Sequence, residues 1–123
     1  MVRNLTVALL LLFSTVSFSQ STDEELIVGK WVSIDDSKWT IEFTSTIWLD
    51  LYDAVKIDSS AYYISNTTGC VEINYSSDTS IVYLNAGKFG NGETECFEIT
   101  GLGKEFLAYR AIRTGRLFTF RRI

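Results

Sequence analysis

Apolar and polar residues alternate along much of the chain, with a period of two. The pattern is clearest in two neighbouring segments, whose apolar positions are Trp39, Ile41, Phe43 and Ile47, Leu49, Leu51. Such a period is typical of β-strands that bury one face and expose the other. We expect Thr44-Ser45 to form the turn between the two strands, which places Trp48 and Tyr52 on the outer face.

Similar short segments follow as far as the C-terminus. They cover residues 60–64, 70–75, 81–84, 95–99, 106–111 and 117–122. Together with a strand that starts near Gly29, they give about nine predicted strands joined by short connections without proline. Parallel pairing needs long crossover connections, so the strands are expected to pair antiparallel.

A meander of this many strands leaves two exposed edges unless it closes on itself. We therefore predict an all-β fold, an antiparallel up-and-down meander closed into a small barrel. An immunoglobulin-like sandwich is the alternative, but it uses longer Greek-key connections than this chain offers. Thr22 followed by Glu25 fits a capping box and predicts a short helical turn over residues 23–28.

The first nineteen residues have the features of a secretion signal. Arg3 precedes an uncharged apolar stretch from Leu5 to Val16, and small residues flank Phe18. Cleavage is expected between Ser19 and Gln20, an ending that resembles those of secreted proteins of the Bacteroidetes. A retained membrane anchor is less favoured, because a spanning helix needs roughly 18 or more apolar residues. We predict a signal peptide over 1–19, a single secreted or periplasmic domain over 20–123, and no membrane span after cleavage.

Cys70 and Cys96 are the two cysteines of the chain. An even number of cysteines in an oxidising compartment favours a disulfide. Consecutive strands would, however, place them on either side of a third strand, about 10 Å apart, beyond the usual reach of about 7 Å between Cα atoms. Either one cysteine lies on a loop or bulge and the two pair, or both thiols are free.

Residues 20–123 carry fifteen acidic and ten basic side chains, a net charge of −5. This balance argues against a nucleic-acid partner, which requires a basic face. Most of the basic residues gather near the C-terminus, as Lys104, Arg110, Arg113, Arg116, Arg121 and Arg122. They either balance acids on neighbouring strands or form a patch for an anionic ligand or partner.

The sequence offers little for catalysis. It has no histidine, which removes the commonest general base and the commonest nitrogen ligand for metals. Its cysteines lack the Cys-x-x-Cys spacing of a zinc site, and no glycine-rich phosphate loop opens a helix. We therefore expect no enzymatic activity, no metal and no cofactor.

Gly29-Lys30-Trp31, the run of hairpins and an arginine at the end of the last strand resemble the calycin group, in particular short bacterial lipocalin-like proteins. In that family the tryptophan closes one barrel end, and an arginine from the last strand lies across its ring. The resemblance implies that Trp31 is the plug after Gly29, with Arg122 as its partner and Arg121 as the second choice. These roles are structural.

The same resemblance implies a binding protein for a small apolar ligand. Aromatic residues expected inside the barrel are the candidate ligand contacts: Trp39, Phe43, Tyr63, Tyr75 and Phe97. Alternatively, the interior is filled and the barrel acts at its surface, as an inhibitor or on an envelope protein partner. Trp48, Tyr52 and the C-terminal arginines are the candidates for that surface.

Overall fold

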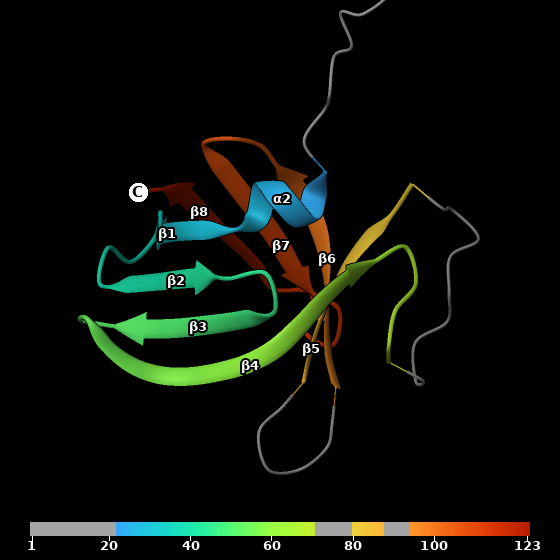
Figure 1. Cartoon of the computed structure of the whole chain (residues 1–123), viewed down its shortest axis with the longest axis horizontal. Helices are drawn as coiled ribbons and strands as arrows, with labels where there is room; N and C mark the ends of the chain where they lie inside the picture. The colour runs from blue at the N-terminus through green and yellow to red at the C-terminus, as the bar shows by residue number, and fades with distance from the viewer. Residues whose placement is uncertain (1–21, 71–79, 88–93) are drawn as a thin grey trace, which may run out of the picture.

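A computed structural model describes residues 22–70, 80–87 and 94–123. Within these residues it contains one short helix, α2 (Asp23–Ile27), and the strands β1 (Gly29–Ser33), β2 (Trp39–Phe43), β3 (Ile47–Tyr52), β4 (Val55–Ser65), β5 (Val82–Gly87), β6 (Thr94–Leu102), β7 (Phe106–Ala111) and β8 (Leu117–Arg122) (Figure 1). No helix in the described ranges is long and apolar enough to cross a membrane. The predicted signal peptide at 1–19 and the predicted strand residues 71–75 lie outside them.

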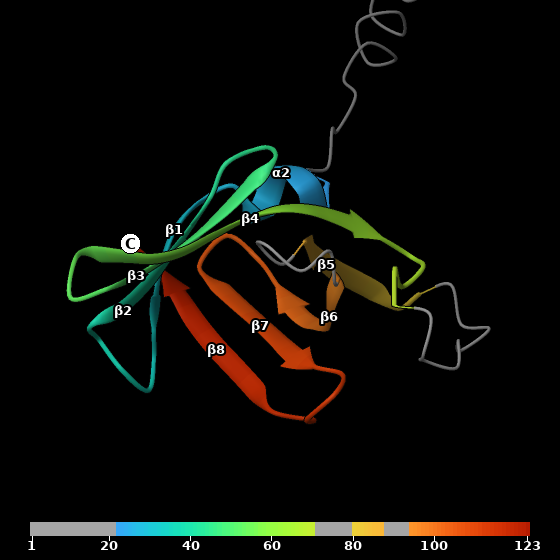
Figure 2. The ribbon, with the colours of Figure 1, turned by 90° about the horizontal axis from the view of Figure 1, so that it is seen from below.

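The strands form a closed antiparallel barrel in simple sequence order, from β1 to β8. Closure comes from β1 and β8, where Trp31 pairs with Arg122 and Ser33 with Phe120. Seen from below, β7 and β8 form one wall of the barrel and the long β4 arches over the other (Figure 2). The all-β closed meander predicted from the sequence is thus confirmed.

The helical turn at the N-terminal side is also confirmed. The backbone N–H of Glu25 donates to the side-chain oxygen of Thr22 (3.3 Å), which caps α2. Ile27 at the end of the helix is completely buried. The helix packs against β4 and β6 and so covers one end of the barrel.

The interior face of β3 was predicted wrongly. In the β2–β3 pairing, Phe43 is opposite Trp48 and Ile41 is opposite Asp50. Because Phe43 and Ile41 point into the barrel, Trp48 and Asp50 of β3 also point inward. Ile47, Leu49 and Leu51, which were expected inside, are half-buried on the other face. The connection has three residues (44–46) instead of the predicted two, and a one-residue shift turns every side chain of a strand to the opposite face.

β4 differs from its prediction in two ways. It begins at Val55, earlier than the predicted residue 60, because Asp53 and Ala54 form a two-residue hairpin turn with positive φ angles of 51° and 64°. Its inward face carries Tyr62, whose hydroxyl donates to the carbonyl oxygen of Thr44. Tyr63, expected inside, is 52% exposed on the outer face.

The barrel end under α2 is filled. Its buried side chains include Ile27, Trp31, Ile41, Phe43, Leu84, Leu107 and Phe120. Trp31 is fully buried and donates from Nε1 to the carbonyl oxygen of Ile27 (2.9 Å). The guanidinium carbon of Arg122 lies 4.1 Å from the centroid of the Trp31 ring, which stacks the cation on the indole.

Arg122 also binds the backbone at this end. It donates to the carbonyl oxygens of Lys104 (2.6 Å), Val28 (2.9 Å) and Leu26. Gly29 has a φ of +137°, and a side chain there would collide with the guanidinium. The positive φ and the close approach of Arg122 each require glycine at position 29.

A disulfide joins Cys70 to Cys96, with 6.2 Å between their Cα atoms. Cys96 lies in β6, whereas Cys70 lies in the segment that follows β4, so the strand-spacing objection does not apply. The segment covers the outer face of β5, where the buried Asn85 side chain accepts from the backbone N–H of Gly69 (2.8 Å). The disulfide therefore ties residues 66–70 to the barrel wall.

Candidate functional site

A cavity of about 550 Å³ opens at the barrel end opposite α2. Its lining comes from every strand except β1: Trp39, Trp48, Asp50, Asp58, Ser60, Ala86, Gly87, Glu95, Phe97, Tyr109, Ala111, Thr114, Arg116 and Phe118. These residues lie near the connections between β3 and β4 and between β7 and β8, away from Trp31. The barrel is thus packed at one end and hollow at the other, a cavity of the size that holds small ligands.

Aromatic rings form much of the cavity wall. Trp48 lies 5.3 Å from Phe97 and 5.5 Å from Tyr109, centroid to centroid, in edge-to-face contacts. Tyr109 is 5.4 Å from Phe118, which is 5.5 Å from Trp39. The rings continue into the packed end through Phe43 and Phe120. Because each ring is held by its neighbours, the wall is largely preformed.

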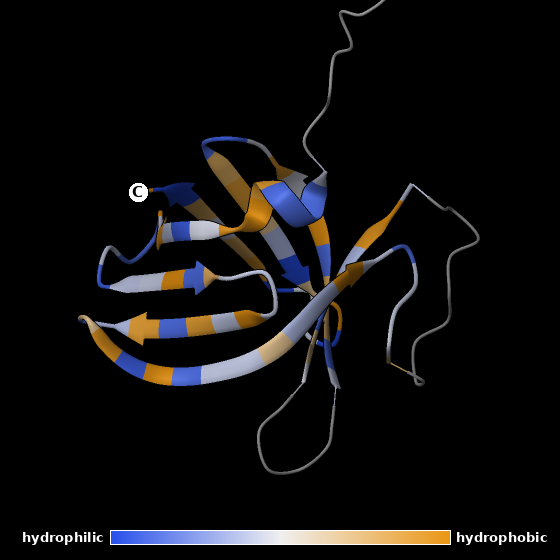
Figure 3. Ribbon diagram, in the orientation of Figure 1, coloured by the Kyte–Doolittle hydropathy of each residue, from blue (hydrophilic) through white to orange (hydrophobic). Residues whose placement is uncertain are grey.

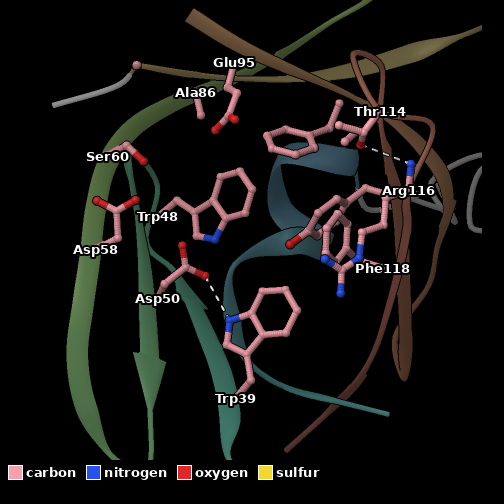
Figure 4. A pocket seen from close by; sticks show the side chains of 14 residues that line it. Trp39, Trp48, Asp50, Asp58, Ser60, Ala86, Glu95, Thr114, Arg116 and Phe118 are labelled. Carbon is pink, nitrogen blue, oxygen red and sulfur yellow. Dashed lines mark hydrogen bonds between the residues drawn. The ribbon is translucent and has the colours of Figure 1, made fainter. Parts of the chain in front are cut away.

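The indole nitrogen of Trp48 lacks a hydrogen-bond partner among the described residues. The side chain is only 5% exposed, and Nε1 is its buried donor. Trp48 projects into the middle of the cavity, with Asp50 and Asp58 to one side and Arg116 and Phe118 to the other (Figure 4). A buried donor without an acceptor costs about 1–3 kcal/mol, so a ligand that brings an acceptor against this N–H would be stabilised.

Three carboxyl groups face the cavity from three strands. Asp50 (β3) accepts a hydrogen bond from Trp39 Nε1 at 3.2 Å, Asp58 lies on β4 and Glu95 on β6. Burial raises the pKa of Asp50 from 3.8 to about 6, and the charges of Asp58 and Glu95 add to the increase against the opposing hydrogen bond from Trp39. No ion pair to Asp50 is present in the described part of the chain.

On the opposite wall lies Arg116, the single cationic residue among the lining residues that the structure describes. Its guanidinium carbon lies 5.0 Å from the centroid of Phe118, and its side chain is exposed at the rim. Beside it, burial raises the pKa of Tyr109 well above 10, with the charges of Asp50 and Glu95 contributing. The phenol is therefore neutral over the physiological range.

The polar side chains of the cavity come from several strands. Within the described ranges, no group of three histidine, cysteine, aspartate or glutamate side chains is placed to hold a metal ion. The serine and threonine of the wall have no histidine neighbour, because the chain contains no histidine. The cavity combines an apolar wall with a few convergent polar groups, as small-molecule sites do.

The candidate ligand contacts predicted from the sequence lie in different parts of the barrel. Trp39 and Phe97 line the cavity, whereas Phe43 lies deeper, in the packed core. Tyr63 faces away from the interior, and Tyr75 lies outside the described residues. Of the two residues predicted on the outer surface, Trp48 is buried, so its prediction was wrong, whereas Tyr52 is exposed.

Several cavity residues were not singled out as ligand contacts from the sequence. Asp50 and Trp48 were assigned to the outer face by the wrong strand register, and Asp58 precedes the predicted start of its strand. Tyr109 and Phe118 alternate correctly along β7 and β8 and could have been found from that period. The carboxylates carry no such signal, because polar residues at interior positions break the pattern.

Comparison of the chain with protein-family models, with curated proteins and with solved structures gave no match.

Proposed function

We propose that this chain is a lipocalin-like binding protein that holds one small organic molecule in the open half of its barrel. A ring-lined cavity of about 550 Å³, whose lining residue Trp48 has an Nε1–H without an acceptor among the described residues, is the observation that carries this proposal. Such a cavity gives apolar area to the ligand, and the N–H adds one directional contact. The stack of Arg122 on Trp31 further supports the resemblance to lipocalin-like proteins.

The Cys70–Cys96 disulfide supports the proposed location outside the cytoplasm. Disulfides persist in oxidising compartments and are rare in the cytosol. Together with the predicted signal peptide, it favours a secreted or periplasmic carrier. A periplasmic or extracellular barrel would meet small molecules before they enter the cell.

The alternative of a filled barrel acting at its surface has less support. It depended on Trp48 as an outward residue, and Trp48 lies inside. It also required a fully packed interior, whereas the half away from α2 is hollow. Tyr52 and the C-terminal arginines alone do not define a partner.

A fluorescence titration with N-phenyl-1-naphthylamine, a neutral probe that brightens in apolar sites, tests the proposal. We expect saturable binding of one probe per chain at micromolar concentrations. Ala111→Phe fills the cavity from a half-buried lining position and should weaken binding at least about tenfold. Ala61→Phe, on the exposed face of β4, is the matched control and should change the affinity less than about twofold.

Two results would overturn the proposal. One is a flat titration of the folded wild-type protein both with this probe, up to its solubility limit, and with small phenols such as tyrosol and tyramine. The other is equal binding by the wild type and the folded Ala111→Phe variant, which would place the probe elsewhere on the surface.

A further inference from the structure

We infer that the ligand of this cavity is a small organic cation, an amine or quaternary ammonium attached to an aromatic body that carries an oxygen acceptor. This inference rests on the proposed binding function and specifies its ligand class. It departs from the apolar ligand expected from the sequence, because the structure places charged groups inside the cavity.

The charges of the lining favour a cation. Among the described residues of the lining, three carboxyl groups, from Asp50, Asp58 and Glu95, face one guanidinium, that of Arg116. Arg116 lies over the Phe118 ring on the wall across from Asp50 and Asp58 (Figure 4). In a closed barrel of this strand order β4 lies opposite β8, so the acidic and basic walls are separated by the cavity. A ligand cation near Asp50 would therefore meet a carboxylate that has no ion-pair partner among the described residues.

The carboxyl groups do not converge on a metal-sized point. No cluster among the described residues is suited to a metal ion, although three acids line the cavity. The space between them is bounded by the rings of Trp39 and Trp48. Aromatic faces attract cations electrostatically, and this attraction suits a bulky, weakly hydrated ammonium group.

The second polar feature is the free donor of Trp48. Its Nε1–H requires an acceptor, which an ammonium group lacks. The ligand must therefore bring a lone pair as well as a positive charge. A phenol, ether or carbonyl oxygen on the aromatic body would satisfy the indole while the ammonium group lies beside Asp50.

Isothermal titration calorimetry with three matched probes tests this inference. Tyramine carries the ammonium group, tyrosol replaces it with a neutral hydroxyl, and 4-hydroxyphenylacetate replaces it with a carboxylate. At pH 7.5 we expect tyramine to bind at least about tenfold more tightly than either analogue, since only its charge complements the carboxyl groups.

Variants of the carboxyl groups locate the cation. Asp50→Asn keeps an acceptor for Trp39 and should weaken tyramine binding about tenfold while leaving tyrosol binding within about twofold. Glu95→Gln provides a second lining position on β6 with the same expected direction. Glu42→Gln, which removes a carboxylate at a position of β2 outside the cavity lining, is the matched control and should change neither affinity.

Each outcome is decisive. Tyrosol or 4-hydroxyphenylacetate binding as tightly as tyramine would overturn the cation inference and leave the binding function standing. The same holds if N-phenyl-1-naphthylamine binds but none of the three phenols does. If neither the naphthylamine nor any phenol binds the folded protein, the binding function itself fails.

Discussion

Trp31 and Arg122 are directly paired across the β1–β8 seam that closes the barrel, with the guanidinium carbon 4.1 Å from the centroid of the indole ring. The pair joins the first and last strands and also anchors the end of α2, through the carbonyl oxygens of Leu26 in the helix and Val28 directly after it. It therefore stabilises the packed end of the barrel, away from the cavity.

Replacing Arg122 should destabilise the fold. Arg122→Ala removes the stack and leaves the carbonyl oxygens of Leu26, Val28 and Lys104 without their donor, and we expect a loss of about 2–4 kcal/mol in the free energy of unfolding. Arg121→Ala, at the neighbouring exposed position, should change it by less than about 0.5 kcal/mol. Urea unfolding followed by tryptophan fluorescence measures both, and equal losses would show that the Trp31 stack is unimportant.

Ala54→Gly should stabilise the protein. Ala54 adopts a φ of 64° in the hairpin between β3 and β4, a conformation that costs a residue with a Cβ about 1 kcal/mol and costs glycine almost nothing. We expect a gain of about 0.5–1 kcal/mol. Ala61→Gly, within β4, should instead lose about 0.5–1 kcal/mol. A destabilised Ala54→Gly variant would contradict the hairpin geometry.

The Asp50 carboxyl group should make stability depend on pH. Its pKa of about 6 in the folded protein exceeds the ordinary 3.8, so between these values the folded chain retains a proton that the unfolded chain releases. The contribution of this group to stability therefore falls as the pH rises from 4 to 6 and remains unfavourable above that range. Below pH 4 it vanishes, because both states are protonated.

Asp50→Asn removes this penalty. The variant should be about 1–2 kcal/mol more stable than the wild type at pH 7.5, a value reduced from the full shift because the carboxyl group is partly exposed. The difference should shrink toward zero at pH 3.5. Chemical unfolding at the two pH values, with Glu42→Gln as the control for loss of one charge, measures it; a difference independent of pH would contradict the assignment.

Removing the disulfide should cost stability without abolishing the barrel. The double variant Cys70→Ala/Cys96→Ala removes a cross-link between residues 26 positions apart in the sequence. Loss of that cross-link raises the entropy of the unfolded chain and should lower the free energy of unfolding by about 3 kcal/mol. The intact protein should be lighter by two hydrogens than its reduced form in mass spectrometry. Equal masses before and after reduction would show that the two thiols are free.

Much of the fold follows from the residue pattern. The alternation of Trp39, Ile41 and Phe43 correctly gave the interior face of β2, since each is directed inward. Short connections without proline correctly indicated an antiparallel meander, and the Thr22–Glu25 spacing indicated the cap of α2. These features depend on local spacing, which a sequence displays directly.

The cavity was harder to predict, because it depends on register. Along β3 the hydrophobic residues Ile47, Leu49 and Leu51 alternate with less hydrophobic ones (Figure 3). Hydropathy alone would therefore place the face with these three residues inside the barrel. The structure instead buries Trp48, which lies 5.1 Å from the Phe43 ring and fills more of the interior than a leucine would. The hairpin at Asp53-Ala54 contains no glycine, so the beginning of β4 and the inward position of Tyr62 carried no turn signal.

The indole N–H resonances of the ¹⁵N-labelled protein test the central claim most directly. The chain has three tryptophans, of which Trp31 is at the packed end while Trp39 and Trp48 line the cavity. On saturation with tyramine, and separately with tyrosol, we expect the Trp48 cross-peak to move furthest and the Trp31 cross-peak to stay in place. A stationary Trp48 cross-peak with both probes, or a shift confined to Trp31, would contradict a ligand site in the open half of the barrel.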